Sequence, residues 1–172
     1  MSEEEEFEAA RGEMKRLMAS VRSCILATVS SLGQPLSSYA PVWVGESGAW
    51  YVYVSAMAKH YGHLRKACCT SALLLEDEAV AESIFARRRL AVDCSCTLVE
   101  RDSEEWLLGT GGLEERHGET MGYLKGLTDF DLFRLEPSEG RLVLGFGKAY
   151  RVSGKCLGEI SYVRAGGHKS GS

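Results

Sequence analysis

The sequence lacks an excess of basic residues, a long uninterrupted apolar run and a basic amino-terminal stretch. Its 20 Lys and Arg stand against 24 Asp and Glu, a formal net charge of −4. This balance argues against nucleic acid as the main partner, because a phosphate-binding surface normally carries a basic excess. No apolar run approaches the roughly 20 residues that cross a bilayer, so we expect no membrane insertion. Four glutamates at residues 3–6 make the start of the chain acidic, unlike the basic start of a signal peptide, and we expect a cytoplasmic protein.

The six cysteines show no pattern typical of a disulfide framework or a zinc site. Cys24 lies in an apolar run, Cys68 and Cys69 are adjacent, and Cys94 and Cys96 share one face of a predicted strand. A zinc site would need a second pair at matching spacing. Without an export signal, we expect the cysteines to be reduced, buried and unreactive.

Length and composition indicate one globular domain over residues 1–172. The chain is 45% apolar and 26% charged, and it is long enough to bury a core. Residues 1–21 predict an amphipathic helix that packs on the rest, and residues 164–172 predict a flexible, Gly- and Ser-rich tail that carries His168. The apolar side of the helix comprises Phe7, Met14, Leu17, Met18 and Val21.

Short extended runs separated by turn residues predict an antiparallel barrel rather than a parallel sheet. The first runs cover residues 24–29, 37–44 and 49–55, and a short polar helix over 58–66 follows them. Pro41 cannot donate to a strand ladder, so its strand is expected at an edge or at a bulge.

Further elements follow in the second half. Leu90–Val99 alternates between an apolar face and a mixed face, and the mixed face suits a partner or ligand. A helix is expected after a cap at Asp102 or Ser103, with a break at residues 109–112, because glycine disfavours helix. The remaining predicted strands are 71–75, 130–135, 142–146 and 148–152, with 137–140 as a hairpin turn.

Several short motifs occur in a fixed order. They are Ser38-Tyr39-Ala40-Pro41, Ala58-Lys59-His60, Glu76-Asp77-Glu78, Phe85–Leu90 and Gly145–Tyr150. This set resembles the haem-utilisation (haem-degrading) proteins of the split β-barrel superfamily, which are related in fold to the FMN-binding pyridoxamine 5'-phosphate oxidases. The resemblance spans about residues 22–168. It implies a mainly β, α+β fold: a six- to seven-stranded antiparallel split barrel with flanking helices, paired as a homodimer.

The resemblance also implies a haem site. Gly167-His168 matches the pair whose imidazole is the axial ligand of haem iron in the family, although from the sequence alone a histidine in such a tail has no assigned role. Asp129 matches the aspartate that accepts the other ring proton, with Asp131 as the alternative. If the histidine and the aspartate came from different subunits, the site would depend on dimerisation.

Arg87-Arg88-Arg89 is ordinarily read as a solvated basic face. At a strand entrance it can instead meet the haem propionates, because guanidinium groups bind carboxylates bidentately. By the resemblance, Arg89 is nearest the haem and Arg87 and Arg88 support it. His60 matches a histidine near the ligand cleft, whereas two further histidines, His63 and His117, are expected on the surface.

Three functions stay open at this point. The resemblance implies a protein that binds haem b and cleaves it oxidatively to release iron, with an external electron donor. A non-enzymatic haem carrier or store would need the same residues. An FMN-dependent pyridoxamine 5'-phosphate oxidase-like enzyme would need basic residues on the second strand, and residues 39–44 contain none, although Lys59 or Arg65 could replace them in part.

Overall fold

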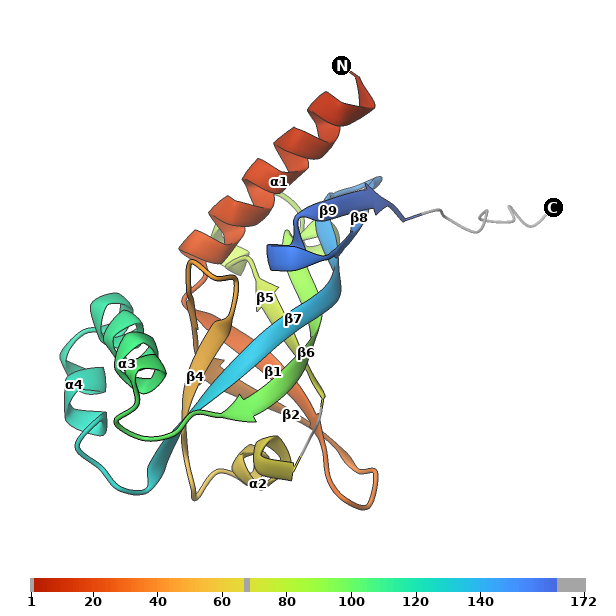
Figure 1. The fold of residues 1–172 in the computed structure, drawn as a ribbon. Coiled ribbons are helices and arrows are strands. Elements are labelled where there is room, and N and C mark those ends of the chain that lie inside the picture. Colours follow the sequence, from red (N-terminus) through yellow and green to blue (C-terminus); the bar gives the residue numbers. More distant parts are fainter. Residues whose placement is uncertain (1, 67–68, 164–172) are drawn as a thin grey trace.

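The computed structural model describes residues 2–66 and 69–163 (Figure 1). One antiparallel sheet follows the strand order β2-β1-β5-β6-β7-β4-β3, and β8 and β9 extend it from β7. This curled sheet with flanking helices confirms the predicted split barrel. The strands are β1 (Ser23–Val29), β2 (Pro35–Pro41), β3 (Trp43–Val44), β4 (Trp50–Ser55), β5 (Thr70–Leu75), β6 (Arg89–Leu98), β7 (Phe130–Gly145), β8 (Lys148–Ser153) and β9 (Glu159–Tyr162). The helices are α1 (Glu3–Ser20), α2 (Lys59–Lys66), α3 (Glu104–His117) and α4 (Glu119–Leu124), with 3-10 turns η1 (Glu78–Val80), η2 (Ile84–Ala86) and η3 (Lys155–Leu157).

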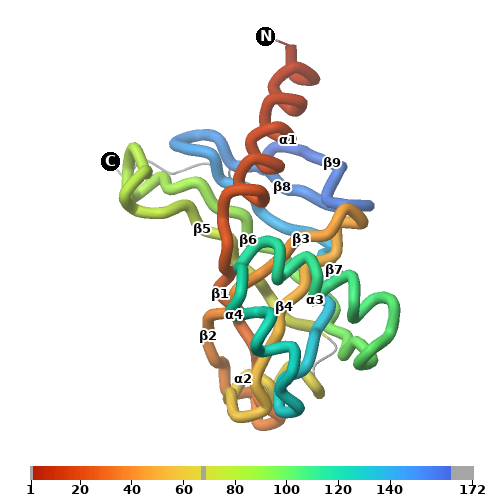
Figure 2. Tube along the Cα trace, turned by 90° about the vertical axis from the view of Figure 1, so that its left-hand side faces the viewer, coloured from red at the N-terminus to blue at the C-terminus, as the bar shows by residue number. Residues whose placement is uncertain are grey.

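Helix α1 forms and packs as its pattern predicts. Ser2 and Glu5 make a capping box, and the acidic first turn suits the positive end of the helix dipole. The helix crosses one end of the barrel, and α2 lies at the other end (Figure 2). The buried residues of α1 are Phe7, Ala10, Met14 and Leu17, and Met18 and Val21 pack beside them.

Pro41 ends the edge strand β2, as expected for a residue that cannot donate to a ladder. The predicted run 37–44 is therefore two strands. After Pro41 the chain passes through buried Val42 and leaves β1 to pair with β4 as β3. The proline lies where the chain changes its pairing partner.

The hairpin turn predicted at residues 137–140 is wrong, because β7 runs through it without a turn. On one side β7 pairs with β4 as far as Leu135, and from Glu139 it pairs with β8. Pro137 lies between these ladders, next to the register shift in β6, so its missing N–H is tolerated. Gly140 is there for close approach: a Cβ would lie 2.4 Å from the carbonyl oxygen of Ala91.

The helix break predicted at residues 109–112 is also wrong, since α3 is continuous. Its glycines allow the helix to approach the sheet closely. A Cβ at Gly109 would lie 2.7 Å from Leu132, and one at Gly112 would lie 2.3 Å from the ring of Trp43. Tertiary packing therefore overrides the low helix propensity of glycine. Ser103 caps the helix, as predicted.

Helix α3 creates a second core on the outside of β4. The even-numbered residues of β4 face the barrel core, and Tyr51 and Tyr53 face α3 and α4. In β6 the predicted apolar face is buried through Cys94, and beyond the bulge there the alternation fades, so that Leu98 is 39% exposed. Ala91 and Asp93 lie on the opposite, outer face of the sheet.

Burial differs among the cysteines. It raises the pKa of the Cys24 and Cys94 thiols to about 12 and that of Cys96 to about 11. Cys69 and Cys156 are exposed, so the expectation that all cysteines are buried is wrong for these two. Cys156 projects from the tight turn η3, where its backbone is left-handed. Cys68 and the predicted tail 164–172 lie outside the described residues.

None of the helices within residues 2–66 and 69–163 is long and apolar enough to cross a bilayer.

Candidate functional site

The predicted site residues lie at two opposite ends of the β6–β7 ladder. Arg89 pairs with Val143 at one end, which we call the arginine end and which also holds α1 and β9. Asp129 directly precedes β7 at the other end, which we call the Asp129 end and which holds α2 (Figure 1). From Asp129 to Val143 is 14 residues of chain, roughly 45 Å along a strand.

At the Asp129 end, two neighbouring aspartates have different surroundings. The backbone carbonyl of Asp129 accepts from Ala56 N–H at 2.7 Å, which ties the start of β7 to the end of β4. No described donor bonds to its exposed carboxylate. By contrast, Asp131 accepts the hydroxyl of Tyr61, which in turn accepts from Arg65 at 3.2 Å. Asp129 is therefore the carboxylate that is open to an incoming donor.

Arg101 holds the loop that carries Asp129, a role that nothing in the sequence indicated. Its guanidinium donates to the carbonyls of Lys125 at 2.7 Å, Leu127 at 2.9 Å and Phe130 at 3.2 Å. It also lies over the ring of Trp106, 5.3 Å from the centroid. One side chain thus satisfies three carbonyls within six residues, which fixes the loop from inside the protein.

The histidines of α2 lie at the same end. His60 is half-buried, and burial, followed by the charge of His63, lowers its pKa. His63 is not a free surface residue, because its Nδ1 pairs with the hydroxyl of buried Thr28 at 3.0 Å. His117 was expected to be exposed, but it is half-buried and bonds to the carbonyl of Val42 at 3.2 Å. The described part of the chain contains no group of three residues suited to hold a bare metal ion.

At the arginine end, two members of the Arg87-Arg88-Arg89 triplet have partners. Arg87 donates to the carbonyl of Glu76 and pairs with Glu78 at 3.0 Å. Arg88 binds the carboxylate of Glu76, which is only 6% exposed, and that hydrogen bond is the main cause of the raised pKa of Arg88. These contacts brace the entrance of β6, so both charges are largely satisfied within the protein.

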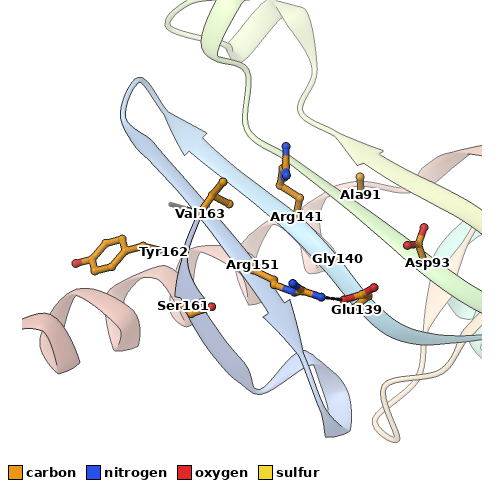
Figure 3. A pocket seen from close by; sticks show the side chains of 9 residues that line it. All are labelled: Ala91, Asp93, Glu139, Gly140, Arg141, Arg151, Ser161, Tyr162 and Val163. Carbon is orange, nitrogen blue, oxygen red and sulfur yellow. Dashed lines mark hydrogen bonds and ion pairs between the residues drawn. The ribbon is translucent and has the colours of Figure 1, made fainter. Parts of the chain in front are cut away.

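Arg89 differs from its neighbours. The one hydrogen bond from its side chain to a described residue goes to the carbonyl of Arg87 at 3.0 Å, and no described carboxylate pairs with it. It lies on the outer face of the sheet, two residues before Ala91. Ala91 lines a concavity of about 630 Å³ across β6 to β9 (Figure 3). Val163, the last described residue, lines the same concavity and bonds to Ala149.

The fold therefore brings some predicted residues together and separates others. His60 and Asp129 share one end of the barrel, whereas Arg87 and Arg89 lie at the other. His168 lies outside the described residues, five positions beyond Val163.

Comparison with known proteins identifies proteins that are similar to this chain in sequence and structure. Residues 10–144 match the sequence model of the pyridoxamine 5'-phosphate oxidase family. The chain is 40% identical over 157 residues to the heme oxygenase HutZ of Vibrio cholerae, covering 91% of this chain and 89% of that protein. The crystal structure of V. cholerae HutZ, described there as a heme storage protein, is 38% identical with a TM-score of 0.70, covering 74% of this chain and 89% of that chain. Campylobacter jejuni ChuZ has a TM-score of 0.85 at 28% identity, covering 96% of this chain and 66% of that chain.

Proposed function

We propose that this chain, which belongs to the pyridoxamine 5'-phosphate oxidase family and to its HutZ-like haem-utilisation branch, binds haem and opens its ring oxidatively to release iron. The observation that carries the proposal is the 40% identity with a heme oxygenase over 91% of the chain. Arg89 supports it, because this cation at the predicted position has no carboxylate partner among the described residues.

The residues present fit haem as a ligand. Haem is a flat apolar ring with two carboxylates on one edge, so its site needs cations beside an open surface. Arg89 supplies a guanidinium without a described acidic partner. The concavity of about 630 Å³, which begins two residues along β6 at Ala91, is within the size range of ligand sites. Gly167-His168 supplies the imidazole to which the family resemblance gives the role of iron ligand.

Each residue has a distinct task in this proposal. His168 ligates the iron through one ring nitrogen, and Asp129 accepts the proton of the other. That bond orients the imidazole and strengthens it as a ligand. Arg89 binds a propionate. Haem supplies the redox chemistry when bound, and an external donor supplies the electrons.

The reach of the chain argues that the site needs two copies. His168 is five residues beyond Val163, and five fully extended residues span at most about 18 Å. Asp129 lies roughly 45 Å from the arginine end along β7, well beyond that reach. In our proposal His168 of one subunit therefore meets Asp129 of the other, in a homodimer.

The outer face of the sheet offers a surface for this pairing. Tyr39, Ile25, Leu73 and Ala91 are cross-strand partners in one row over β2, β1, β5 and β6. Tyr39 is 66% exposed and Ile25 is 40% exposed, although both are large and apolar. Exposed apolar surface of this kind is typical of a protein interface.

Two other functions use the same fold. Haem storage is favoured by the description of the HutZ structure, and every binding residue would serve it equally. Flavin binding is favoured by the wider family, but the exposed side of β2 carries no basic residue for the flavin phosphate. Arg65, one of the proposed replacements, lies over Tyr61 and donates to its hydroxyl, which leaves Lys59.

A hemin titration followed by absorbance tests the proposal on the wild type, on His168→Ala and on the control His63→Ala. We expect a saturable Soret band with about one haem per chain, lost or shifted only in His168→Ala. Ascorbate in air should then bleach the band if the ring is opened, whereas a retained band would indicate storage. No specific Soret band, together with bound flavin, would overturn the haem proposal.

A further inference from the structure

Arg141 is an arginine of the concavity whose side chain has no hydrogen-bond or ion-pair partner among the described residues. It is exposed on β7 and lines the concavity with Asp93, Glu139 and Arg151. Arg151 is paired with Glu139, whereas the side chain of Arg141 lies apart from that pair (Figure 3). An unpaired guanidinium in a hollow is suited to bind an anion.

The strand register places Arg141 close to Arg89. Ala91 pairs with Arg141 and Arg89 pairs with Val143, so the two arginines are diagonal neighbours on adjacent strands. They share the outer face, because Leu90 and Leu142 between them point into the core. Diagonal neighbours have Cα atoms about 7–8 Å apart, a spacing that lets two long side chains hold two carboxylates of one small molecule.

The concavity also lies where the tail begins. Val163 lines it, and the proposed iron ligand His168 follows five residues later, within about 18 Å of extended chain. A haem ligated by this histidine can therefore present its polar edge to this face. Asp93 also lines the concavity and would repel a carboxylate, which limits the anion site to the side nearer Arg89.

We propose that Arg89 and Arg141 form a two-cation clamp in which each guanidinium binds one of the two propionates of the same haem. The clamp rests on the proposed haem function and adds a second binding residue to it. Arg141 then contributes affinity and fixes the rotation of the ring about the iron–imidazole bond, which a single cation would leave free.

Haem affinity of Arg141→Ala tests the clamp, because this exposed side chain can be removed without leaving a cavity. We expect the Kd for hemin to rise about tenfold or more, as for loss of a charge-assisted hydrogen bond. Arg141→Lys should recover part of the loss. The control Lys148→Ala removes an exposed cation of the neighbouring strand outside the concavity and should change the Kd by less than about twofold.

Iron protoporphyrin dimethyl ester, which lacks the carboxylates, separates the clamp from a structural effect. It should bind the wild type and Arg141→Ala equally. An unchanged hemin Kd in Arg141→Ala, or an equal loss for hemin and its ester, would overturn the clamp while leaving the proposed function intact. A wild-type chain that gives no saturable Soret band would overturn both.

Discussion

The two ends of the β6–β7 ladder are built in opposite ways. At the Asp129 end the half-buried cation Arg101 donates to backbone carbonyls, and no described donor bonds to the carboxylate of Asp129. At the arginine end the buried carboxylate of Glu76 binds Arg88, and the guanidinium of Arg89 has no described acidic partner. Each end thus engages one charged side chain within the protein and leaves one side chain of the opposite charge without a described charged partner.

This difference indicates how a binding site can be divided between chains. A single barrel carries the anionic half and the cationic half of the proposed haem site at opposite ends, too far apart for one ligand. Two barrels that associate through their outer faces could bring the Asp129 end of one to the arginine end of the other. The predictions below disturb first the packing of α3 and then the two ends, from the largest effect to the smallest.

Gly112→Val should be the most damaging change, and it acts on the packing of α3 against β3. Its side chain would collide with Trp43 and push α3 off the sheet, and we expect the free energy of unfolding to fall by about 3 kcal/mol or more. Gly111→Ala is the matched control, since a Cβ there meets nothing within 4 Å. It should be neutral or stabilising by up to about 1 kcal/mol. Equal losses in both variants by chemical denaturation would contradict the packing role of Gly112.

Glu76→Gln disturbs the arginine end. It removes the charge that holds Arg88. We expect the free energy of unfolding to fall by about 2 kcal/mol, because the hydrogen bond is charge-assisted and its carboxylate is buried. Glu78→Gln removes an exposed carboxylate paired with Arg87 and should cost less than about 1 kcal/mol. If the two variants unfold alike in denaturant, Glu76 does not brace this end.

Arg101→Gln should loosen the Asp129 loop more than it destabilises the whole chain. We expect the free energy of global unfolding to fall by about 1 kcal/mol, whereas amide exchange in residues 125–131 should become clearly faster. Arg116→Gln is matched, because Arg116 also donates to three carbonyls, those of Met18, Ala19 and Val21. Its exchange change should be confined to the end of α1; faster exchange at 125–131 in both variants would argue against a local anchor.

The two ends should also respond to different pH ranges. Burial lowers the pKa of His60 below its ordinary 6.5, so the unfolded chain binds the proton more readily and stability falls as the pH drops below that value. Hydrogen bonds from Tyr150 and Tyr162 lower the pKa of Glu6 below its ordinary 4.5, so its contribution is lost only in stronger acid. Denaturation midpoints are measured between pH 7.5 and 3. His60→Gln should reduce the loss of stability below about pH 6.5, and Glu6→Gln should reduce the loss below about pH 4.5. Glu8→Gln, which loses a carboxylate paired with Arg11, is the control, and unchanged slopes in all three variants would contradict this assignment.

Local patterns predicted most of the barrel, and the errors have a common cause. The amphipathic pattern of α1, the edge position of Pro41 and the buried face at Leu90 and Val92 were all readable, because each depends on one element and one neighbour. Gly112 and Pro137 were misread as breaks. Both are explained by a second element, Trp43 in one case and the change from β4 to β8 in the other, which a single sequence does not reveal.

The site was predictable only in part for the same reason. The family pattern selects Arg89 and Asp129. It does not show that Arg88 is bound to Glu76, or that Asp131 accepts a hydrogen bond from Tyr61. Arg101 gave no signal, because an arginine in a turn is ordinarily solvated. Its role becomes visible only once three carbonyls are seen to converge on it.

Mixing two defective chains tests the divided haem site most directly. His168→Ala and Asp129→Asn chains, each lacking one of the two proposed residues, are unfolded together, refolded at equal concentration and titrated with hemin. If the halves come from different subunits, half of the dimers are mixed and each has one intact site, so about a quarter of all sites should regain the wild-type Soret band. If both residues act within one chain, no site is restored and the mixture matches the average of the two variants, which would contradict the account.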